Sequence, residues 1–392
     1  MNSVFPQDAT HACLVGRLWQ PGLGAVLCLV TPNDVYDASS VAATSADLLA
    51  LDAPAIALRS ALPHLPRIGS TPELIASSAY KSSSAGQNHA YFLAPCDLQP
   101  IKAAGVTFVA SMLERVIEEQ ARGDASKALA VREKVIAAIG DNLREGNVSV
   151  VPGSDKAMQV KAVLMALGMW SQYLEVGIGK DAEVFTKSQA MSAVGYGAQI
   201  GIHPESHWNN PEPEVVLAVS PQGVVQGVAL GNDVNLRDIE GRSALLLGKA
   251  KDNNASCAIG PFIRLFDENF SLDDVRHAEI KLVVTDDEGF MMEGSSSMSQ
   301  ISRDPLDLVA QTINANHQYP DGFMLFCGTM FAPTQDRFAK GQGFTHAVGD
   351  CVTVSSPRLG SLTNWVNTCD QISPWIYGAR ALMRDLARRG LL

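Results

Sequence analysis

Residues 212–233 read EPEVVLAVSPQGVVQGVALGND, two apolar runs joined by a Pro-Gln-Gly turn. Each run is rich in β-branched residues and has strand length, so the stretch predicts an antiparallel hairpin. Glu212 and Glu214 open the first run two positions apart, so both side chains point to the same face, with Cα atoms about 6.5–7 Å apart. Asp233 ends the second run, where the returning strand carries it back beside the two glutamates.

Three carboxylates in one small volume repel one another unless a positive charge balances them. No cysteine or histidine stands at the spacing of a structural zinc site here, which favours an all-oxygen site for Mg²⁺, with Mn²⁺ or Ca²⁺ as substitutes. Glu212, Glu214 and Asp233 are therefore the predicted metal ligands. The alternative is that Glu-Pro-Glu is an acidic loop before a strand and Asp233 a turn residue.

Composition narrows the class of protein. Among 392 residues, 46% are hydrophobic and 18% are charged, which is typical of a globular protein. The net charge of −11 argues against nucleic acid or an anionic membrane as a partner. Seven cysteines form no CxxC pair, and neither a leader sequence nor an apolar run of membrane length is recognisable. We therefore expect a cytoplasmic protein with reduced thiols.

The chain is long enough for two or three domains. Apolar runs separated by turns predict hairpins in its first part, and a short helix is expected over 40–51. Residues 63–89 look like a loop, with Lys81-Ser-Ser-Ser-Ala-Gly-Gln-Asn as the most linker-like piece. We therefore predict a small N-terminal domain over 1–90 and a catalytic domain over 91–392.

The larger segment shifts from helical to strand patterns. Helices are expected over 109–122, 125–139, 156–173 and 376–389. Strands are expected over 183–187, 215–219, 224–230, 278–285, 322–327 and 351–355. Many strands with few late helices indicate an α+β, mainly β fold of the sandwich or roll type.

Basic residues follow the acids. Arg237, Lys249 and Lys251 come soon after Asp233, and they suit an anionic substrate such as a 2-oxo acid, which chelates a metal through its carboxylate and keto oxygens. The alternative is that these side chains pair with local acids on the surface, which is the commoner arrangement.

Several motifs occur together along the chain: Glu212-x-Glu214, Asp233, Asn235-x-Arg237-Asp238, Lys251 six residues before Cys257-x-x-Gly260-Pro261, Phe185-x-Lys187, Gly328-Thr329 and Gly349-Asp350. This set resembles the fumarylacetoacetate hydrolase family. The likeness covers roughly residues 94–392 and implies a mixed β-sandwich roll with a smaller N-terminal α/β domain. It also implies a divalent cation on the three acids and a homodimer or homotetramer.

Longer strings narrow the likeness to the sugar-acid dehydratases of this family; they include SHWNNPEPEVVL, GNDVNLRDIEGRSALLL and KAKDNNASCAIGPF. The likeness implies a hydro-lyase that converts 2-keto-3-deoxy-D-xylonate (2-dehydro-3-deoxy-D-pentonate) to 2-oxoglutarate semialdehyde, in the oxidative, non-phosphorylated pentose pathway (Weimberg pathway). The alternatives are a C–C hydrolase or decarboxylase of an acylpyruvate-type 2-oxo acid, and a non-catalytic Ca²⁺-binding protein.

One departure helps to choose among these reactions. Hydrolases of the family carry a His-x-x-Glu dyad after a Gly-x-Asn-Tyr turn, and the histidine helps to activate water. Here the turn is Gly105-Val-Thr-Phe108 and the dyad is Ser111-Met-Leu-Glu114. The serine removes the expected water-activating base, so the resemblance favours a dehydratase.

The resemblance also suggests residue roles. Counting back from Gly260-Pro261 selects Lys251, rather than Lys249, as the catalytic lysine. Burial beside a metal would lower its pKa enough to take a C3 proton. Glu114 is the candidate for helping the C4 hydroxyl leave or taking a C5 proton, and the order of these roles is open, as is the C4 stereochemistry of the substrate. The expected substrate-binding residues are Arg237, Thr329, Gly105 and Asn235.

Overall fold

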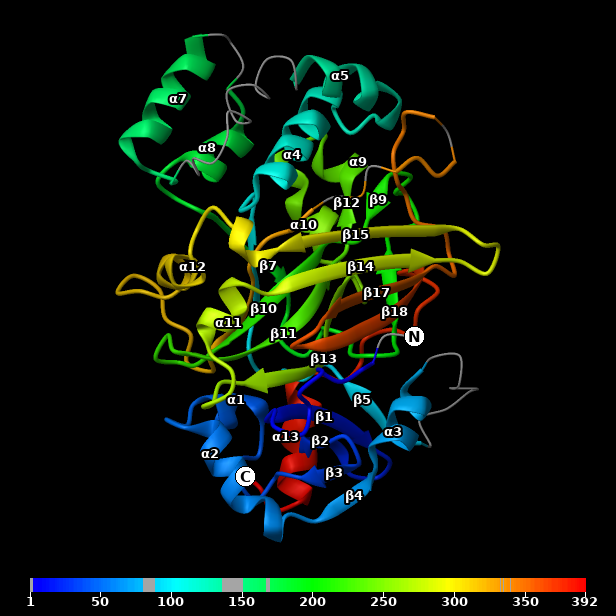
Figure 1. The fold of residues 1–392 in the computed structure, drawn as a ribbon. Coiled ribbons are helices and arrows are strands. Elements are labelled where there is room, and N and C mark those ends of the chain that lie inside the picture. Colours follow the sequence, from blue (N-terminus) through cyan, green and yellow to red (C-terminus); the bar gives the residue numbers. More distant parts are fainter. Residues whose placement is uncertain are drawn as a thin grey trace.

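The computed structural model describes residues 3–392 except 80–88, 136–150, 167–169, 332, 334 and 339. Its two main sheets pack face to face, with a group of helices at one end and a smaller domain at the other (Figure 1). The fold is therefore mixed α+β and mostly sheet, with an N-terminal domain and a larger β-sandwich-like domain, as the sequence predicted.

The larger sheet has eleven strands and holds the predicted hairpin at its centre. In spatial order the strands are β4 (Arg67–Ser70), β3 (Asp34–Asp37), β2 (Gly24–Val30), β1 (Leu14–Gln20), β13 (Cys257–Leu265), β11 (Val225–Asp233), β10 (Pro213–Val219), β16 (Phe323–Phe326), β6 (Ile101–Gly105) and β7 (Glu183–Ser188), with β5 (Tyr91–Leu93) paired to β1. Strands β10 and β11 are buried along their whole length, because both of their faces are covered.

The second sheet has five strands. In order they are β15 (Met291–Ser297), β14 (Glu279–Thr285), β17 (Cys351–Ser356), β18 (Gly360–Thr368) and β8 (Gln199–Ile202). Leu217 and Val228 of the first sheet belong to the same buried cluster as Leu282 and Val354 of the second. This shared core makes the two sheets a sandwich. Strands β9 (Asn209–Asn210) and β12 (Asn235–Leu236) form a separate ribbon.

Among the described residues, four helices gather at one end of the sandwich, and we call them the cap: α4 (Val109–Ala121), α5 (Ala128–Val135), α7 (Asp155–Ala166) and α8 (Gln172–Ile178) (Figure 1). Two short helices, α9 (Arg237–Glu240) and α10 (Leu247–Lys251), lie between the cap and the sheets. Helices α11 (Leu272–Arg276) and α12 (Pro305–Thr312) flank the sandwich.

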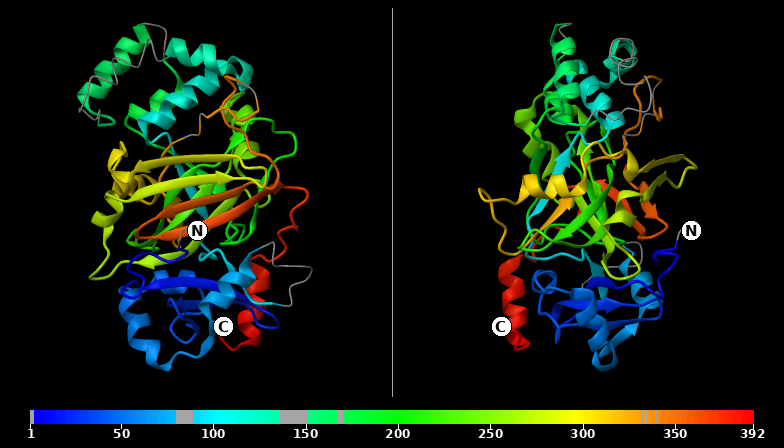
Figure 2. Two further views of the ribbon diagram at one scale, coloured as in Figure 1. Left: turned by 45° about the vertical axis from the view of Figure 1, so that its right-hand side comes forward. Right: turned by 60° about the vertical axis from the view of Figure 1, so that its left-hand side comes forward.

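The N-terminal domain lies at the opposite end. It contains β1 to β4 with α1 (Ser45–Leu49), α2 (Pro54–Ala61) and α3 (Thr71–Ser78), and the last helix, α13 (Ala379–Arg388), stands beside it (Figure 2). Because β1 pairs with β13, the large sheet runs from this domain into the sandwich. The boundary near residue 90 stays a prediction.

All six predicted strands are present, with ends shifted by at most three residues, whereas several helix and loop assignments were wrong. The helix expected from residue 40 spans only Ser45–Leu49, because Thr44 and Asp47 form a capping box that starts it late. The loop expected over 63–89 contains β4 and α3, since β4 gains its partners from distant β3. The last helix begins at Ala379 rather than 376. The single helix expected over 156–173 is two helices, α7 and α8, because the Ser171 side chain accepts from the N–H of Tyr173 and starts a new helix there. Residues 136–139 and 167–169 of the expected helices lie outside the described residues.

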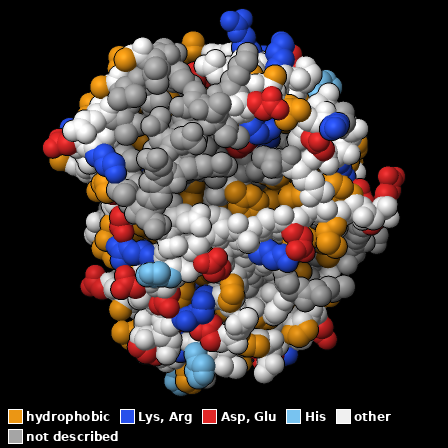
Figure 3. Space-filling view, turned by 45° about the horizontal axis from the view of Figure 1, so that its top comes forward, with side chains coloured by type: hydrophobic (Ala, Val, Ile, Leu, Met, Phe, Trp, Pro, Cys, Tyr) orange, Lys and Arg blue, Asp and Glu red, His pale blue; other side chains and the backbone are white. Residues whose placement is uncertain are grey.

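Within the described ranges, no helix combines the length and apolarity needed to cross a bilayer. Figure 3 views the molecule with its cap end brought forward, and the lysine, arginine, aspartate and glutamate side chains drawn there are intermingled. In the described part of that face, acidic and basic side chains are thus interspersed rather than gathered by sign.

Candidate metal centre and active site

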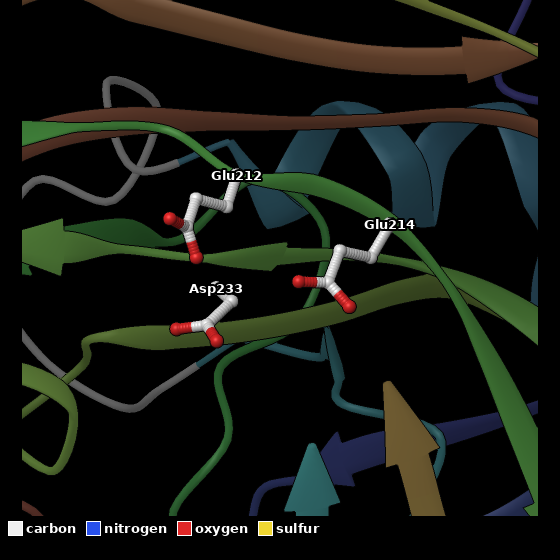
Figure 4. A group of neighbouring side chains, drawn as sticks. All are labelled: Glu212, Glu214 and Asp233. Atoms are coloured by element: carbon white, nitrogen blue, oxygen red, sulfur yellow. The ribbon is translucent and has the colours of Figure 1, made fainter. Parts of the chain in front are cut away.

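The register of the β10–β11 hairpin brings the three predicted acids together. The backbone N–H of Asp233 donates to the carbonyl of Glu212 at 3.0 Å, and Glu214 faces Gly231 across the ladder. The three side chains converge from adjacent strands (Figure 4), with one carboxylate oxygen of each lying within 4.8 Å of the others. All three are buried, so the structure has the geometry that the E-x-E spacing predicted.

Glu214 is held by the Gly-Thr pair that follows β16. The N–H of Gly328 donates to its Oε2 at 2.6 Å, and the Thr329 hydroxyl donates to its Oε1 at 3.2 Å. Gly328 has a φ of +103°, and a Cβ there would lie 2.0 Å from Oγ1 of Thr107. Only glycine fits this turn, which aims the two donors at Glu214.

Two lysines and one arginine neutralise the other two acids. Lys251 Nζ lies 2.6 Å from Oε2 of Glu212 and 3.2 Å from Oδ2 of Asp233. The Arg115 guanidinium donates to Oε1 of Glu212, and Lys187 Nζ lies 2.8 Å from Oδ1 of Asp233. Each of the three acids therefore has a donor or a cation at fixed distance.

The pKa values of Glu212 and Glu214 are shifted in opposite directions. Burial raises the pKa of Glu212, but Arg115 and Lys251 outweigh that effect and lower it to about 2. Burial and the neighbouring charges of Asp233 and Glu212 raise the pKa of Glu214 well above its usual value. This like-charge repulsion is what a divalent cation would relieve, and three carboxylates are the hard oxygen donors that suit Mg²⁺. The donor set therefore fits a divalent metal.

The pKa of Lys251 is shifted in the direction opposite to the one expected from sequence. Burial lowers its pKa, but the carboxylates of Asp233, Glu212 and Glu240 outweigh burial and raise it above the usual value. Lys251 is therefore held as an ammonium in this carboxylate environment. The lowered pKa predicted from sequence requires a dication that neutralises these acids.

A small cavity of about 20 Å³ lies at the three acids, which is room for about one water molecule or ion. It is lined by Ala104, Gly105, Val106, Ser111, Arg115, Glu183, Phe185, Glu212, Glu214, Asp233, Glu240, Lys251 and Thr329. Of the residues predicted from sequence, the cavity thus unites the three acids with Lys251, Ser111, Thr329 and Gly105. Two larger hollows, beside α11 and beside α13, contain none of these residues.

Glu183 is a titratable residue of this cavity that sequence reasoning missed. It opens β7 directly opposite Gly105 of β6, and a Cβ on Gly105 would lie 1.8 Å from Oε2 of Glu183. Burial and the charge of Glu240 raise the pKa of Glu183 to about 7, which suits proton transfer near neutral pH. A lone acid at the start of a strand gives no spacing signal, although Glu183 stands two residues before the Phe185-x-Lys187 motif.

The two positions of the altered dyad lie apart. The Ser111 hydroxyl lines the cavity but donates to the carbonyl of Phe108 at 2.9 Å, a local bond within its own helix. Glu114 is absent from the cavity lining, and its carboxylate pairs with Arg132 of α5 at 2.6 Å. Only the serine therefore faces the acids.

Arg237 and Asn235 lie behind the cavity rather than on it. Both are buried, and each donates to Oδ1 of Asn210, at 2.9 Å from Arg237 and at 3.3 Å from Asn235. Arg237 also lies 3.1 Å from Glu118 of α4. In this arrangement both residues support the cavity wall, and their predicted contact with substrate stays a prediction.

Comparison with known proteins matches this architecture. Residues 179–367 fit the profile of the family described as "Fumarylacetoacetate (FAA) hydrolase C-terminal". The match spans 189 of the 392 residues, so this range is similar to that domain. The matched range includes the three acids, Lys251 and Glu183, whereas the cap helix α4 lies outside it.

Two curated relatives carry dehydratase names. A "2-dehydro-3-deoxy-D-arabinonate dehydratase" from Saccharolobus solfataricus is 30% identical over 183 residues, which is 46% of this chain and 57% of that protein. A "Probable 2-keto-3-deoxyxylonate dehydratase" from Haloferax volcanii is 28% identical over 200 residues, or 51% of this chain and 65% of that protein. The chain thus matches less than two thirds of the length of either relative.

Solved structures share the fold. A 2-keto-3-deoxy-D-arabinonate dehydratase complexed with magnesium and 2,5-dioxopentanoate superposes with a TM-score of 0.58 at 20% identity, covering 91% of this chain and 99% of that one. The fumarylacetoacetate hydrolase of Exiguobacterium antarcticum gives a TM-score of 0.54 at 16% identity, covering 91% and 100%. Dehydratase and hydrolase structures share this fold, so the fold alone does not select the reaction.

Proposed function

We propose that the protein is a metal-dependent dehydratase that converts a 2-keto-3-deoxypentonate, specifically 2-keto-3-deoxy-D-xylonate, to 2-oxoglutarate semialdehyde. The observation that carries the proposal is one cavity that joins three buried carboxylates to Lys251, Glu183 and Ser111. The sequence resemblance aligns Ser111 with the histidine that hydrolases of the family use to activate water. Both curated relatives are named as dehydratases of such sugar acids.

Glu212, Glu214 and Asp233 would hold Mg²⁺, with Mn²⁺ or Ca²⁺ as substitutes. When bound, the cation polarises the 2-keto group of the substrate and so acidifies its C3–H bonds. The glutamate and lysine side chains of the cavity then move the protons. The cavity of about 20 Å³ has room for about one water-sized group, so binding of a five-carbon acid requires its lining side chains to move.

The pKa directions suggest how the proton transfers are divided. Glu183, with a pKa of about 7, takes a proton from C3. Lys251, held as an ammonium, gives a proton to the C4 hydroxyl, which leaves as water while the C3–C4 double bond forms. The sequence left open which of Lys251 and Glu114 acts at C3 and which at C4. Here Lys251 acts at C4, and Glu183 takes the place of Glu114 at C3. Glu114 stays a candidate from the sequence.

The remaining steps restore both groups. The neutral amine of Lys251 takes a proton from C5, and Glu183 returns its proton to C3. The resulting C4–C5 enol tautomerises to the aldehyde, so that one water is lost overall. Thr329 and Gly105 line the cavity where they can contact the substrate hydroxyls. The serine at 111 offers no imidazole to activate a water for C–C cleavage.

The test is direct. Purified protein with Mg²⁺ is incubated with 2-keto-3-deoxy-D-xylonate, its C4 epimer and an acylpyruvate, and the aldehyde and cleavage products are quantified. We expect semialdehyde from the D-xylonate-derived acid at the highest kcat/KM. Cleavage of the acylpyruvate without aldehyde formation would replace the dehydratase by a hydrolase. Metal binding with no turnover of any of the three would favour a Ca²⁺-binding protein.

The predicted homodimer or homotetramer is a separate proposal. It rests on the family resemblance alone, and light scattering of the purified protein measures it directly. A monomer at working concentration would exclude it without affecting the assignment of the reaction.

A further inference from the structure

Arg115 of α4 joins acids from three different elements. Its Nη2 donates to Oε1 of Glu212, and its Nη1 donates to Oε2 of Glu118 at 2.7 Å and lies 2.9 Å from Oε2 of Glu240. All four side chains are buried. Glu212 precedes β10, Glu118 lies one helical turn further along α4, and Glu240 ends α9, so a single guanidinium spans the cap, the sheet and the helix beneath the cap.

The contacts continue beyond Arg115. Oε1 of Glu118 lies 3.1 Å from Nε of Arg237, which donates to Oδ1 of Asn210 at 2.9 Å. The Arg237 guanidinium also lies 5.4 Å from the centre of the Trp208 ring. The buried chain therefore runs from a metal-site carboxylate through α4 and α9 to the β9–β12 ribbon.

We propose that Arg115 is a positioning residue that clamps α4 to the metal centre, so that metal binding at Glu212 orders the cap. The inference rests on the metal site of the proposed function and adds a role for the helix that covers it. Coupling of this kind is reciprocal: if the bound metal stabilises the clamped arrangement of α4, the clamped arrangement strengthens metal binding by the same factor.

The geometry favours a clamp over a simple charge. A planar guanidinium can bond two carboxylates through separate nitrogens while approaching a third, which a lysine ammonium in the same place would not reproduce. Once Glu212 is fixed by a cation on its other side, Arg115 loses freedom, and Ser111 and Glu118 of the same helix face are held with it. A guanidinium that acted only as a charge would instead repel the dication.

The first measurement uses the full-length wild-type protein and the metal alone. Hydrogen–deuterium exchange of peptides covering Val109–Ala121 is compared in EDTA and in saturating Mg²⁺. We expect exchange in this helix to slow by about tenfold on metal binding, within the usual range of coupling between sites. Calorimetry on the same sample establishes that the metal is bound.

Two variants distinguish an Arg115 that links α4 to Glu212 from an Arg115 that acts only through its positive charge. In Arg115→Met we expect the ratio of α4 exchange rates without and with Mg²⁺ to fall to about one, because the link to Glu212 is gone. Arg115→Lys keeps the positive charge but lacks the separate guanidinium nitrogens that bond several carboxylates. It should therefore retain little of the metal-dependent slowing of α4 exchange. It also provides a milder variant if Arg115→Met folds poorly.

The matched control is Arg132→Met. Arg132 of α5 pairs with Glu114 of α4 at 2.6 Å, so this variant loosens the cap at a point that has no contact with the three acids. We expect α4 to exchange faster in both conditions and to keep its roughly tenfold metal response.

The outcomes separate this inference from the proposed reaction. Metal-bound wild type with unchanged α4 exchange would overturn the clamp alone. Tighter Mg²⁺ binding by Arg115→Met, with the slowing of α4 exchange retained, would also overturn the clamp. It would show that Arg115 acts only as a positive charge that repels the dication. No metal binding by wild type would overturn both proposals, whereas a metal-dependent α4 response without aldehyde formation would reject only the dehydratase.

Discussion

The ammonium of Lys251 lies 2.6 Å from Oε2 of Glu212, and this contact distinguishes the two lysines of α10. Lys249, two residues earlier on the same short helix, points to the surface and pairs with exposed Glu205 at 2.5 Å. Two positions along a helix correspond to about 200° of rotation, so only one of the two lysines can face the cavity. The count back from Gly260-Pro261 selected the same residue.

The two lysines provide a matched pair of variants. We expect Lys251→Met to lower kcat by about 10²–10⁴-fold, because the group that gives and takes protons at C4 and C5 is lost. Lys249→Met should change kcat by less than about twofold, since an exposed ion pair contributes little. Rates are measured at saturating Mg²⁺, where bound cation balances the acids. Unchanged kcat in Lys251→Met would exclude Lys251 from proton transfer.

Glu214→Gln tests the metal site itself. The N–H of Gly328 can still donate to the amide oxygen, so the fold should be kept, while loss of one of three carboxylates should weaken Mg²⁺ binding by about 100-fold or more, roughly 3 kcal/mol. Without metal the variant should be at least as stable as wild type, because the repulsion that raises the pKa of Glu214 is gone. Calorimetry and thermal melting measure both effects. Wild-type affinity and turnover in this variant would remove the metal hypothesis.

Glu183→Gln and Glu114→Gln decide which carboxylate transfers protons. Glu183 lines the cavity and has a pKa of about 7, so its loss should lower kcat by about 10²-fold or more with KM little changed. Glu114→Gln removes the ion pair with Arg132, so we expect a lower melting temperature and near-normal kcat. The reverse pattern, with Glu114→Gln inactive and Glu183→Gln active, would restore the assignment made from sequence.

The pKa of Glu183 also predicts a pH dependence of stability. Burial raises this pKa from 4.5 to about 7, so between these values the folded protein keeps a proton that the unfolded chain has released. The resulting stabilisation is complete below pH 4.5 and is lost as the pH rises through 7. Relative to Glu183→Gln, metal-free wild type should lose about 3 kcal/mol of unfolding free energy across this window.

Urea unfolding in EDTA at a series of pH values measures this difference. The glutamine variant is the proper reference because Glu214 and Glu240 titrate in both proteins and cancel. Parallel stability curves for wild type and Glu183→Gln would show that Glu183 has an ordinary pKa. The same series in Mg²⁺ should show a smaller difference, since a nearby cation favours the ionised carboxylate.

The sequence by itself determined the features that depend on near neighbours. Alternation of side chains along a strand placed Glu212 and Glu214 on one face, and the Pro-Gln-Gly turn returned Asp233 to them. The turn also sets the register of β10 against β11, because turn type and loop length fix the pairing of two strands in a hairpin. The same rules identified β7, β14, β16 and β17 but missed β13, the central strand that pairs with β11.

Only the tertiary structure decided which distant groups meet the acids. Parallel pairing of β6 with β16, and antiparallel pairing of β6 with β7, set Gly105 and Glu183 beside the hairpin. Helix α4 then leaves β6 over the site and brings Arg115 to Glu212, 97 positions away in the chain. Such long-range pairings leave no periodic pattern in a single sequence, because they depend on how separate segments pack. Sheet pairing and helix packing, rather than spacing, therefore brought Glu183 and Arg115, the residues proposed for proton transfer and for the clamp, to the acids.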